Sequence, residues 1–176
     1  MKTNKAAFFL FAAVLFTVFA YSFRQNTDPD LGFHLNVGRY IWQHGVIPPN
    51  EALTYSGAEK HYLDPHWLYQ ASLYGAYRLG GYRFLTVVKS LGILLLFLLL
   101  ALHMKENDVP QLPAALLLAS GVFIMEMRFE LRPEEVSWIL LALTMLLLDR
   151  HRRGRKNALR FVPLVMLFWI NLHALF

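Results

Sequence analysis

Long apolar runs separated by short polar segments dominate the pattern of the chain. The apolar residues come in blocks and do not follow the helical period that a surface helix of a soluble domain shows. Such blocks approach the roughly 20 residues that a helix needs to cross a bilayer core. The runs lie at 6–23, 84–103, 110–127, 136–148 and 161–176. The pattern therefore predicts an all-α fold, a polytopic transmembrane helix bundle of about five spans that forms a single membrane domain over residues 1–176.

The first and last apolar runs indicate whether the N-terminus is cleaved and whether the sequence is part of a longer protein. Residues 1–5 are basic and the apolar run 6–23 follows them, as in a secretory signal peptide. The run is longer than the roughly 7–15 residues of a signal-peptide core, and no clear small-residue cleavage site follows it before Arg24. This favours an uncleaved anchor helix. The last run reaches Phe176, so we expect the sequence to be the N-terminal part of a longer protein or a truncated reading frame.

The segment 24–81 is a long polar stretch, and its pattern predicts two amphipathic helices. The first spans 31–44, where apolar residues recur on one face at helical spacing, and Gly45 supplies a C-cap. The second spans 65–79, with Asp64 as its N-cap, and the Gly-Gly pair that follows closes it. Both helices are expected to lie along the membrane interface, where amphipathic segments are stable.

Charge sets the expected orientation. The chain is 56% hydrophobic and 16% charged, with a net charge of +5. Its basic segments are 1–5 and 149–160, and the positive-inside rule makes both cytoplasmic. The N-terminus is then cytoplasmic, whereas 24–81, 128–135 and the surroundings of His173 face the extracytoplasmic side. The basic block lacks the interleaved aromatic residues of a single-strand binding surface, so no nucleic-acid partner is expected.

Two carboxylates and an imidazole follow closely on the first apolar run. Asp28 and Asp30 offer oxygen ligands for a divalent cation, or a general base for an acceptor hydroxyl. His34 lies one helical turn after Asp30 and projects from the same face. On spacing alone, a simpler interpretation is at least as good: Asp30 caps the helix and Asp28 makes the turn into it.

A second polar cluster precedes the second amphipathic helix. Asp64 and His66 form a ligand pair or a hydrogen-bonding pair, with His61 nearby in sequence. The alternative is an N-cap beside an interfacial Trp67. The chain contains no zinc-hydrolase spacing, and the absence of cysteine excludes disulfides, thiolate metal sites and a cysteine nucleophile.

A third polar cluster separates the run 110–127 from the run 136–148. Arginine suits bidentate recognition of phosphate, although a solvated turn that ends the two spans would look the same. His173 and Lys89 lie within apolar runs, where a packed or snorkelling side chain is the usual interpretation. The charged residues of the third cluster are Arg128, Glu130, Arg132, Glu134 and Glu135.

An ordered series of short motifs runs along the chain. The first loop contains Asp28-Pro29-Asp30-Leu31-Gly32-Phe33-His34-Leu35, then Gly38-Arg39 and His44-Gly45-Val46-Ile47-Pro48. Later members are Leu53-Thr54-Tyr55-Ser56, His66-Trp67-Leu68, Leu131-Arg132-Pro133-Glu134 and Trp169-Ile170-Asn171-Leu172-His173. The series resembles bacterial membrane glycosyltransferases of the GT-C type, whose first external loop reads roughly Asp-x-Asp-Leu-Trp-x-His-Leu, then Gly-Arg and Gly-x-Ile-Pro.

The resemblance implies inverting transfer of a sugar from a polyprenyl-phosphate donor to an acceptor at the extracytoplasmic face of the bacterial inner membrane. Asp30 first, and Asp28 second, would act as catalytic base or as ligands of a divalent cation, Mg²⁺ or Mn²⁺. The candidate substrate-binding residues are His34, His66, Arg128, Arg132 and His173, with the two arginines placed near the lipid phosphate by charge and predicted side. The expected partners are the bilayer, the lipid-linked sugar and an acceptor that the sequence does not identify.

Two other functions stay open beside the enzyme. One is a non-catalytic membrane protein, such as a transporter fragment or an assembly subunit. The other is an inactive fragment of the glycosyltransferase with an unclosed substrate cavity. Whether the chain is an enzyme is therefore uncertain at this stage, with the series of motifs favouring the transferase.

Overall fold

The computed structural model describes residues 5–49 and 64–173. The predicted motif Thr54-Tyr55-Ser56 and His61 lie outside the described residues. Within these ranges the chain is all-helical, which confirms the all-α part of the prediction. The elements are α1 (Lys5–Ser22), α2 (Leu31–His44), α3 (Trp67–Glu106), α4 (Gln111–Met125), the 3₁₀ helix η1 (Glu126–Arg128), α5 (Pro133–Arg152), the 3₁₀ helix η2 (Lys156–Phe161) and α6 (Val162–Leu172).

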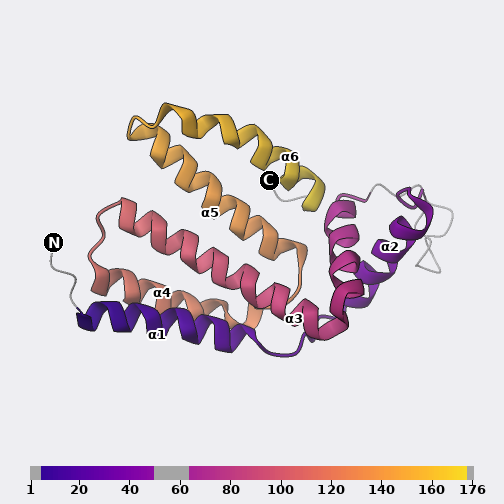
Figure 1. Ribbon diagram of the computed structural model, residues 1–176, viewed down its shortest axis with the longest axis horizontal. Helices are drawn as coiled ribbons and strands as arrows, with labels where there is room; N and C mark the ends of the chain where they lie inside the picture. The colour runs from indigo at the N-terminus through magenta and orange to yellow at the C-terminus, as the bar shows by residue number, and fades with distance from the viewer. Residues whose placement is uncertain (1–4, 50–63, 174–176) are drawn as a thin grey trace.

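Helices α1, α4, α5 and α6 and the second half of α3 lie side by side, and α2 sits at one end of them (Figure 1). Helix α1 packs against α3 and α4, while α5 packs against α3 and α6. Helices α1, α4 and α6 run toward the end that carries α2, and α5 and the second half of α3 run away from it (Figure 1). The connections 23–30 and 126–132 therefore meet at the same end, which we call the α2 end.

Helix α3 contains a sharp change of direction at the predicted Gly-Gly pair. Gly80 has φ −165° and ψ 20°, and Gly81 has φ 63° and ψ −154°, so neither residue is helical. A positive φ at Gly81 is a conformation that a residue with a Cβ rarely adopts. The break divides α3 into a first half that packs on α2 and a second half that joins the long helices (Figure 1). The predicted end of the second amphipathic helix is thus confirmed.

The start of α3 differs from the prediction by two residues. The sequence pattern placed Asp64 at the N-cap and Pro65 at the first helical position, whereas the helix begins at Trp67 with His66 at the N-cap. The Asp64 Oδ1 atom accepts the backbone N–H of His66 at 2.9 Å, which makes a tight turn ahead of the helix. Asp64 therefore orders the entry to α3 through a local turn, as aspartate side chains do outside helices.

The bounds and the C-cap predicted for α2 are confirmed. Gly45 has φ 70° and its N–H donates to the carbonyl of Ile41, as expected of a left-handed C-cap. The helix lies against α3 at Gly38, where a Cβ would clash with the carbonyl oxygen of Gln70. Trp42 adds a hydrogen bond from its Nε1 to the carbonyl of Ala71 at 2.8 Å. The apolar face of α2 is thus used to pack on α3.

The apolar core is divided among three contact regions. The largest joins α1, α3 and α4 and includes Phe97, Leu118 and Phe129. A second joins α2 to the first half of α3 around Leu35 and Leu73, and a third joins α5, η2 and α6. The polar and charged residues of the α2 end lie beside the first two regions.

Two helices in the described residues are long and apolar enough to cross a membrane, Trp67–Glu106 and Gln111–Arg128. Large apolar side chains are exposed on them and on α1, among them Phe16 at 72% and Phe123 at 79%. Helices Phe8–Ser22 and Asn157–Leu172 are apolar but shorter. The expected count of about five spans remains a prediction.

Candidate functional site

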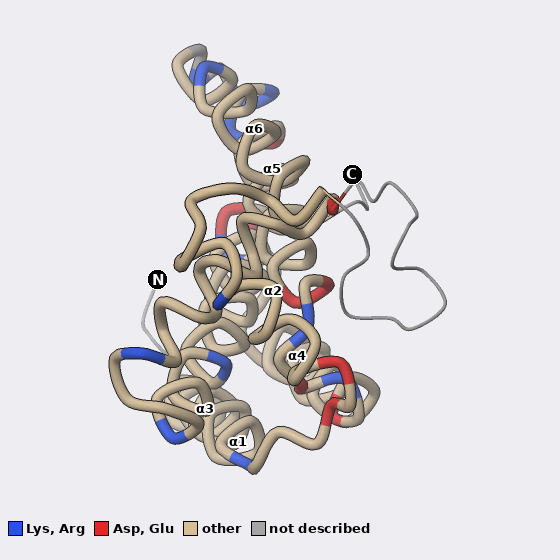
Figure 2. Tube along the Cα trace, turned by 90° about the vertical axis from the view of Figure 1, so that its right-hand side faces the viewer, with Lys and Arg blue, Asp and Glu red and all other residues tan. Residues whose placement is uncertain are grey.

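Residues from four distant segments meet at the α2 end of the molecule. They come from the loop after α1 and the start of α2, from the start of α3, from the connection between α4 and α5, and from the end of α6. Figure 2 looks onto this end, where acidic and basic residues lie near one another. The three polar clusters that the sequence pattern singled out therefore come together, with the residues around His173.

Asp28 and Arg132 form the ionic centre of this region. The Asp28 Oδ2 atom lies 2.9 Å from Arg132 Nε, and Oδ1 accepts a hydrogen bond from Nη2 at 3.1 Å. The Asp28 side chain has 0% exposure, whereas that of Arg132 keeps 33%. The pair thus combines one charge-assisted hydrogen bond with a second close charge contact at Oδ2, which has no hydrogen-bond partner in the described residues. Asp28 is thus already committed to a partner.

Asp30 is available in a way that Asp28 is not. It occupies the N-cap position of α2, but its side chain makes no capping hydrogen bond. Asp28 makes the turn into the helix, because its Oδ1 accepts the backbone N–H of Asp30 at 3.1 Å. The carboxylate of Asp30 is exposed at the helix start, where it can approach a ligand. The turn predicted for Asp28 is thus confirmed, whereas Asp30 takes the N-cap position without the predicted side-chain cap.

His34 lies behind the two carboxylates and is 8% exposed. The Nε2 group of Gln70 donates toward His34 Nδ1 at 3.4 Å, and Tyr69 packs edge-on with ring centroids 5.4 Å apart. Burial, together with the neighbouring His66, lowers the pKa of His34 from 6.5 to about 4. The imidazole is therefore neutral at neutral pH, able to donate one hydrogen bond and accept another.

A second and a third imidazole extend this cluster toward α6. The ring centroid of His66 lies 6.1 Å from that of His34 and 5.3 Å from that of His173. Burial lowers the pKa of His66 and of His173, with Asp64 opposing the change at His66. The two helix ends are also joined by a hydrogen bond from Trp67 Nε1 to Asn171 Oδ1 at 2.9 Å. Three neutral imidazoles thus line one side of the site.

The two arginines predicted to bind the lipid phosphate, Arg128 and Arg132, have different surroundings in the structure. Arg132 binds Asp28, whereas the Arg128 side chain is 62% exposed and its Nη1 lies 3.9 Å from Glu134 Oε2. An exposed pair at that distance contributes little to stability, so Arg128 is free to reorient toward an anion. Arg128 lies in η1 and Arg132 at the N-cap of α5, on the same connection.

A brace holds the loop between α1 and α2 on the connection between α4 and α5. The Glu130 carboxylate accepts hydrogen bonds from the backbone N–H and the hydroxyl of Thr27, each at 3.1 Å. Lys89, from the second half of α3, donates from Nζ to the carbonyl of Arg24 at 2.8 Å. Lys89 is 1% exposed, so its charge is used inside the fold and does not snorkel to the surface.

Sequence reasoning did not single out Ser137 or Gln70 as members of this site. Ser137 Oγ lies 2.7 Å from His173 Nδ1 and accepts a hydrogen bond from Trp169 Nε1 at 2.8 Å. A serine inside an apolar run is a signal that could have found it, because a polar group in a membrane helix usually has a partner. Gln70 lies one turn after His66 on α3, on the face that meets α2.

The residues present do not fit the divalent cation that the two aspartates suggest. A cation between Asp28 and Asp30 would have to compete with the guanidinium of Arg132 for the Asp28 oxygens. In the described ranges 5–49 and 64–173, no three His, Asp or Glu side chains are arranged to hold a metal ion. The cation therefore remains a sequence-based prediction, and we route no chemical step through it.

Comparisons of the chain with protein-family models, with curated proteins and with solved structures find no match.

Proposed function

We propose that the chain is part of a membrane glycosyltransferase of the GT-C type. It would transfer a sugar from a polyprenyl-phosphate donor to an acceptor at the extracytoplasmic face of a bacterial inner membrane. The main support for the proposal is that residues far apart in the sequence meet at the α2 end. The short motifs of the resemblance are spread along the sequence, yet four of those that are described contribute residues to one site: Asp28 and His34, His66, Arg132, and His173.

The roles follow from the differences between the side chains. Asp30 is the base, because its carboxylate is exposed and has no bound partner among the described residues. It would take the proton of the acceptor hydroxyl as that oxygen attacks the sugar. Asp28 is a positioning residue that turns the chain into α2 and holds Arg132. Arg128, on the surface beside this pair, is the better candidate for the lipid phosphate. The neutral imidazoles of His34, His66 and His173 suit hydrogen bonding to sugar hydroxyls.

The direction of the helices supports a membrane setting for this site. The connections 23–30 and 126–132 lie at the α2 end, whereas the basic segment 149–160 lies at the opposite end (Figure 1). The positive-inside rule then assigns the α2 end to the extracytoplasmic face. A lipid-linked phosphate sits at the membrane interface, where water is partly excluded and charged groups interact more strongly than in bulk water.

Substitution of the proposed base tests the reaction. Asp30→Asn in the full chain should lower sugar transfer by about 100-fold or more, in line with the contribution of a general base. Transfer is measured in isolated membranes supplied with radiolabelled polyprenyl-phosphate hexoses, by following label into envelope glycans. Asp108→Asn is the matched control, because Asp108 is exposed in the turn between α3 and α4 and its φ of 56° also suits asparagine.

The outcomes separate the enzyme from the other two candidate functions. Loss of transfer in Asp30→Asn with full activity in Asp108→Asn supports the enzyme and the assigned base. Unchanged transfer in Asp30→Asn would remove Asp30 from the mechanism. Absence of any transfer by the unmodified chain across the hexose donors would favour a non-catalytic membrane protein or an inactive fragment.

A further inference from the structure

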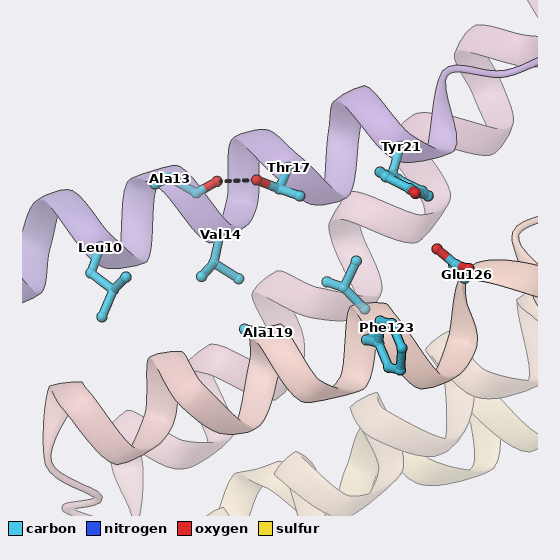
Figure 3. Close-up of a pocket in the computed structure, with 9 residues that line it drawn as sticks. Leu10, Ala13, Val14, Thr17, Tyr21, Ala119, Phe123 and Glu126 are labelled. Atoms are coloured by element: carbon cyan, nitrogen blue, oxygen red, sulfur yellow. Dashed lines mark hydrogen bonds between the residues drawn. The ribbon is translucent and has the colours of Figure 1, made fainter.

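A groove runs between α1 and α4 on a face away from the histidine cluster. Its volume is about 370 Å³, within the range of about 300–1,000 Å³ that small-molecule sites occupy. Leu10, Val14 and Phe123 are among the apolar residues that line it, and Ala13 and Ala119 leave room between the two helices (Figure 3). The groove is open on one side, so a flexible chain can enter it laterally.

One end of the groove is polar. Tyr21 of α1 and Glu126 of η1 face each other there, on the side of the α2 end (Figure 3). In the described part of the chain, the Glu126 carboxylate has no ion-pair or hydrogen-bond partner. A carboxylate without a partner at the end of an apolar groove indicates a ligand that is apolar along its length and cationic near its head.

A cation lies close to Glu126. Arg24 Nη2 donates to the backbone carbonyl of Glu126 and lies 3.9 Å from Glu130 Oε1. The Arg24 side chain remains 37% exposed, and its buried Nε has no hydrogen-bond partner in the described residues. Arg24 does not line the groove itself, but its guanidinium contacts the backbone of Glu126, which does. A positive group therefore lies next to the negative end of the groove, and this arrangement complements a zwitterionic head better than an anionic one.

The length of the groove favours a lipid chain over a helix of a partner protein as its occupant. Its lining residues cover about 16 Å of α1, from Leu10 to Tyr21, and about 10 Å of α4 and η1, from Ala119 to Glu126. The hydrocarbon core of a bilayer is about 30 Å thick. The groove thus matches the depth of one leaflet, whereas a spanning helix of a partner would need a face along the whole of α1 and α4.

We propose that the groove binds one acyl chain of a zwitterionic aminophospholipid of the outer leaflet. Its phosphate would meet Arg24 and its primary ammonium would meet Glu126. This inference depends on the proposed membrane orientation but not on glycosyl transfer, and its ligand is a component of the bilayer and not the sugar donor. Tyr21, at the same end, lies where tyrosine side chains favour the membrane–water interface.

The test uses the full chain purified in detergent, offered equal amounts of phosphatidylethanolamine and phosphatidylglycerol with the same acyl chains. Native mass spectrometry measures which lipid is retained. We expect about tenfold preference for phosphatidylethanolamine, because a charge-assisted hydrogen bond from the ammonium to Glu126 is worth about that factor. Glu126→Gln should reduce retention of phosphatidylethanolamine about tenfold and leave that of phosphatidylglycerol unchanged.

A pair of neighbouring alanines supplies the steric test. Ala13→Phe fills the groove and should abolish retention of both lipids, whereas Ala12→Phe adds the same side chain at an exposed position outside the groove lining and should change nothing. Equal retention of the two lipids by the unmodified chain, a preference for phosphatidylglycerol, or an unaltered preference in Glu126→Gln would each overturn the proposal. The readout needs no sugar transfer, so the proposed reaction and the lipid site fail independently.

Discussion

The two ends of the helix bundle use charged residues in different ways. At the end opposite α2, Arg150 holds Glu106 through Nε and Nη2, with the shortest distance at 2.6 Å. Arg153 donates to the Glu106 carbonyl and to Asn107, and His103 lies 3.4 Å from Asp149. These groups join the ends of α3 and α5 through ion pairs and hydrogen bonds, and His103 Nδ1 is the one buried side-chain atom among them without a hydrogen-bond partner in the described residues.

The α2 end contains buried groups that are only partly committed. Asp28 has its arginine, and the ring of His66 lies 3.8 Å from the Asp64 carboxylate. Within the described ranges, no ion pair is found for the exposed carboxylate of Asp30 or for the imidazoles of His34 and His173. Burial lowers the pKa of the three histidines and raises that of Asp64, so the neutral forms are favoured. Burying neutral polar groups without full partners lowers the stability of the fold, but leaves these groups able to bind a ligand.

The comparison indicates which end is built for stability and which for a ligand. Satisfied ion pairs near water need no ligand, whereas buried titratable groups without full partners are typical of functional sites. Substitutions at the α2 end should therefore have larger and more specific effects than equivalent ones at the opposite end.

The largest expected effect comes from Gly38, where α2 crosses the first half of α3. In Gly38→Ala the new Cβ would clash with the Gln70 carbonyl and lie 2.8 Å from the Cβ of Tyr74, closer than side chains tolerate. Separating the two helices should cost about 3 kcal/mol or more, by analogy with overpacked cores. The measurement is the thermal unfolding midpoint of the protein in detergent.

Gly32 provides the matched control for this substitution. It lies on the same helix, and a Cβ there would have no atom within 4 Å. Gly32→Ala should leave the midpoint unchanged or raise it, by up to about 1 kcal/mol of helix propensity. Equal effects of the two substitutions would show that the close crossing of α2 and α3 is not what holds the site together.

A matched pair of carboxylates compares the two ends directly. Asp28→Asn removes a charge whose side chain has 0% exposure, and should destabilise the fold by about 2 kcal/mol because Arg132 loses its ionic partner. Glu106→Gln makes the same change where the side chain is 18% exposed, and about 0.5–1 kcal/mol is expected. Chemical unfolding in detergent measures both. A cost at Glu106 that equals or exceeds the cost at Asp28 would contradict the proposed division between the ends.

The sequence contains enough local information to predict the helices. Gly45 and Gly81 act on their own neighbours through positive φ values that only glycine adopts easily, and the ends of both amphipathic helices were predicted where the structure has them. The convergence of the polar clusters at one end also followed from counting spans. Local chemistry and hydrophobic length are short-range properties, so a single sequence reveals them.

The pairings within the site could not be predicted because they join residues far apart in the chain. Asp28 and Arg132 are 104 positions apart, as are Trp67 and Asn171. Spacing predicted the local roles of the two aspartates, a turn for Asp28 and a helix cap for Asp30, but it carried no signal that Asp28 would meet Arg132. Lys89 was expected to snorkel or find a partner, and its partner proved to be a backbone carbonyl, that of Arg24, which carries no signal in the sequence.

Acid should destabilise the α2 end through His34, with the smallest effect of the three. The pKa of His34 is about 4 in the folded chain, lowered from 6.5 by burial and by His66, while Asp28 and Asp30 oppose the change. Between these two values the unfolded chain binds a proton that the folded chain does not, so stability is lost as pH falls from 6.5 toward 4. At pH 5.5 the loss should be about 1 kcal/mol relative to pH 7.

Asp64 acts in the opposite sense because burial raises its pKa, so the measured quantity is the difference between the unmodified protein and His34→Asn. That variant should have a flatter thermal midpoint between pH 7 and pH 5.5, whereas His151→Asn, at an exposed histidine of the opposite end, should keep the original slope. An unaltered slope in His34→Asn would mean that the buried imidazole does not distinguish the two ends.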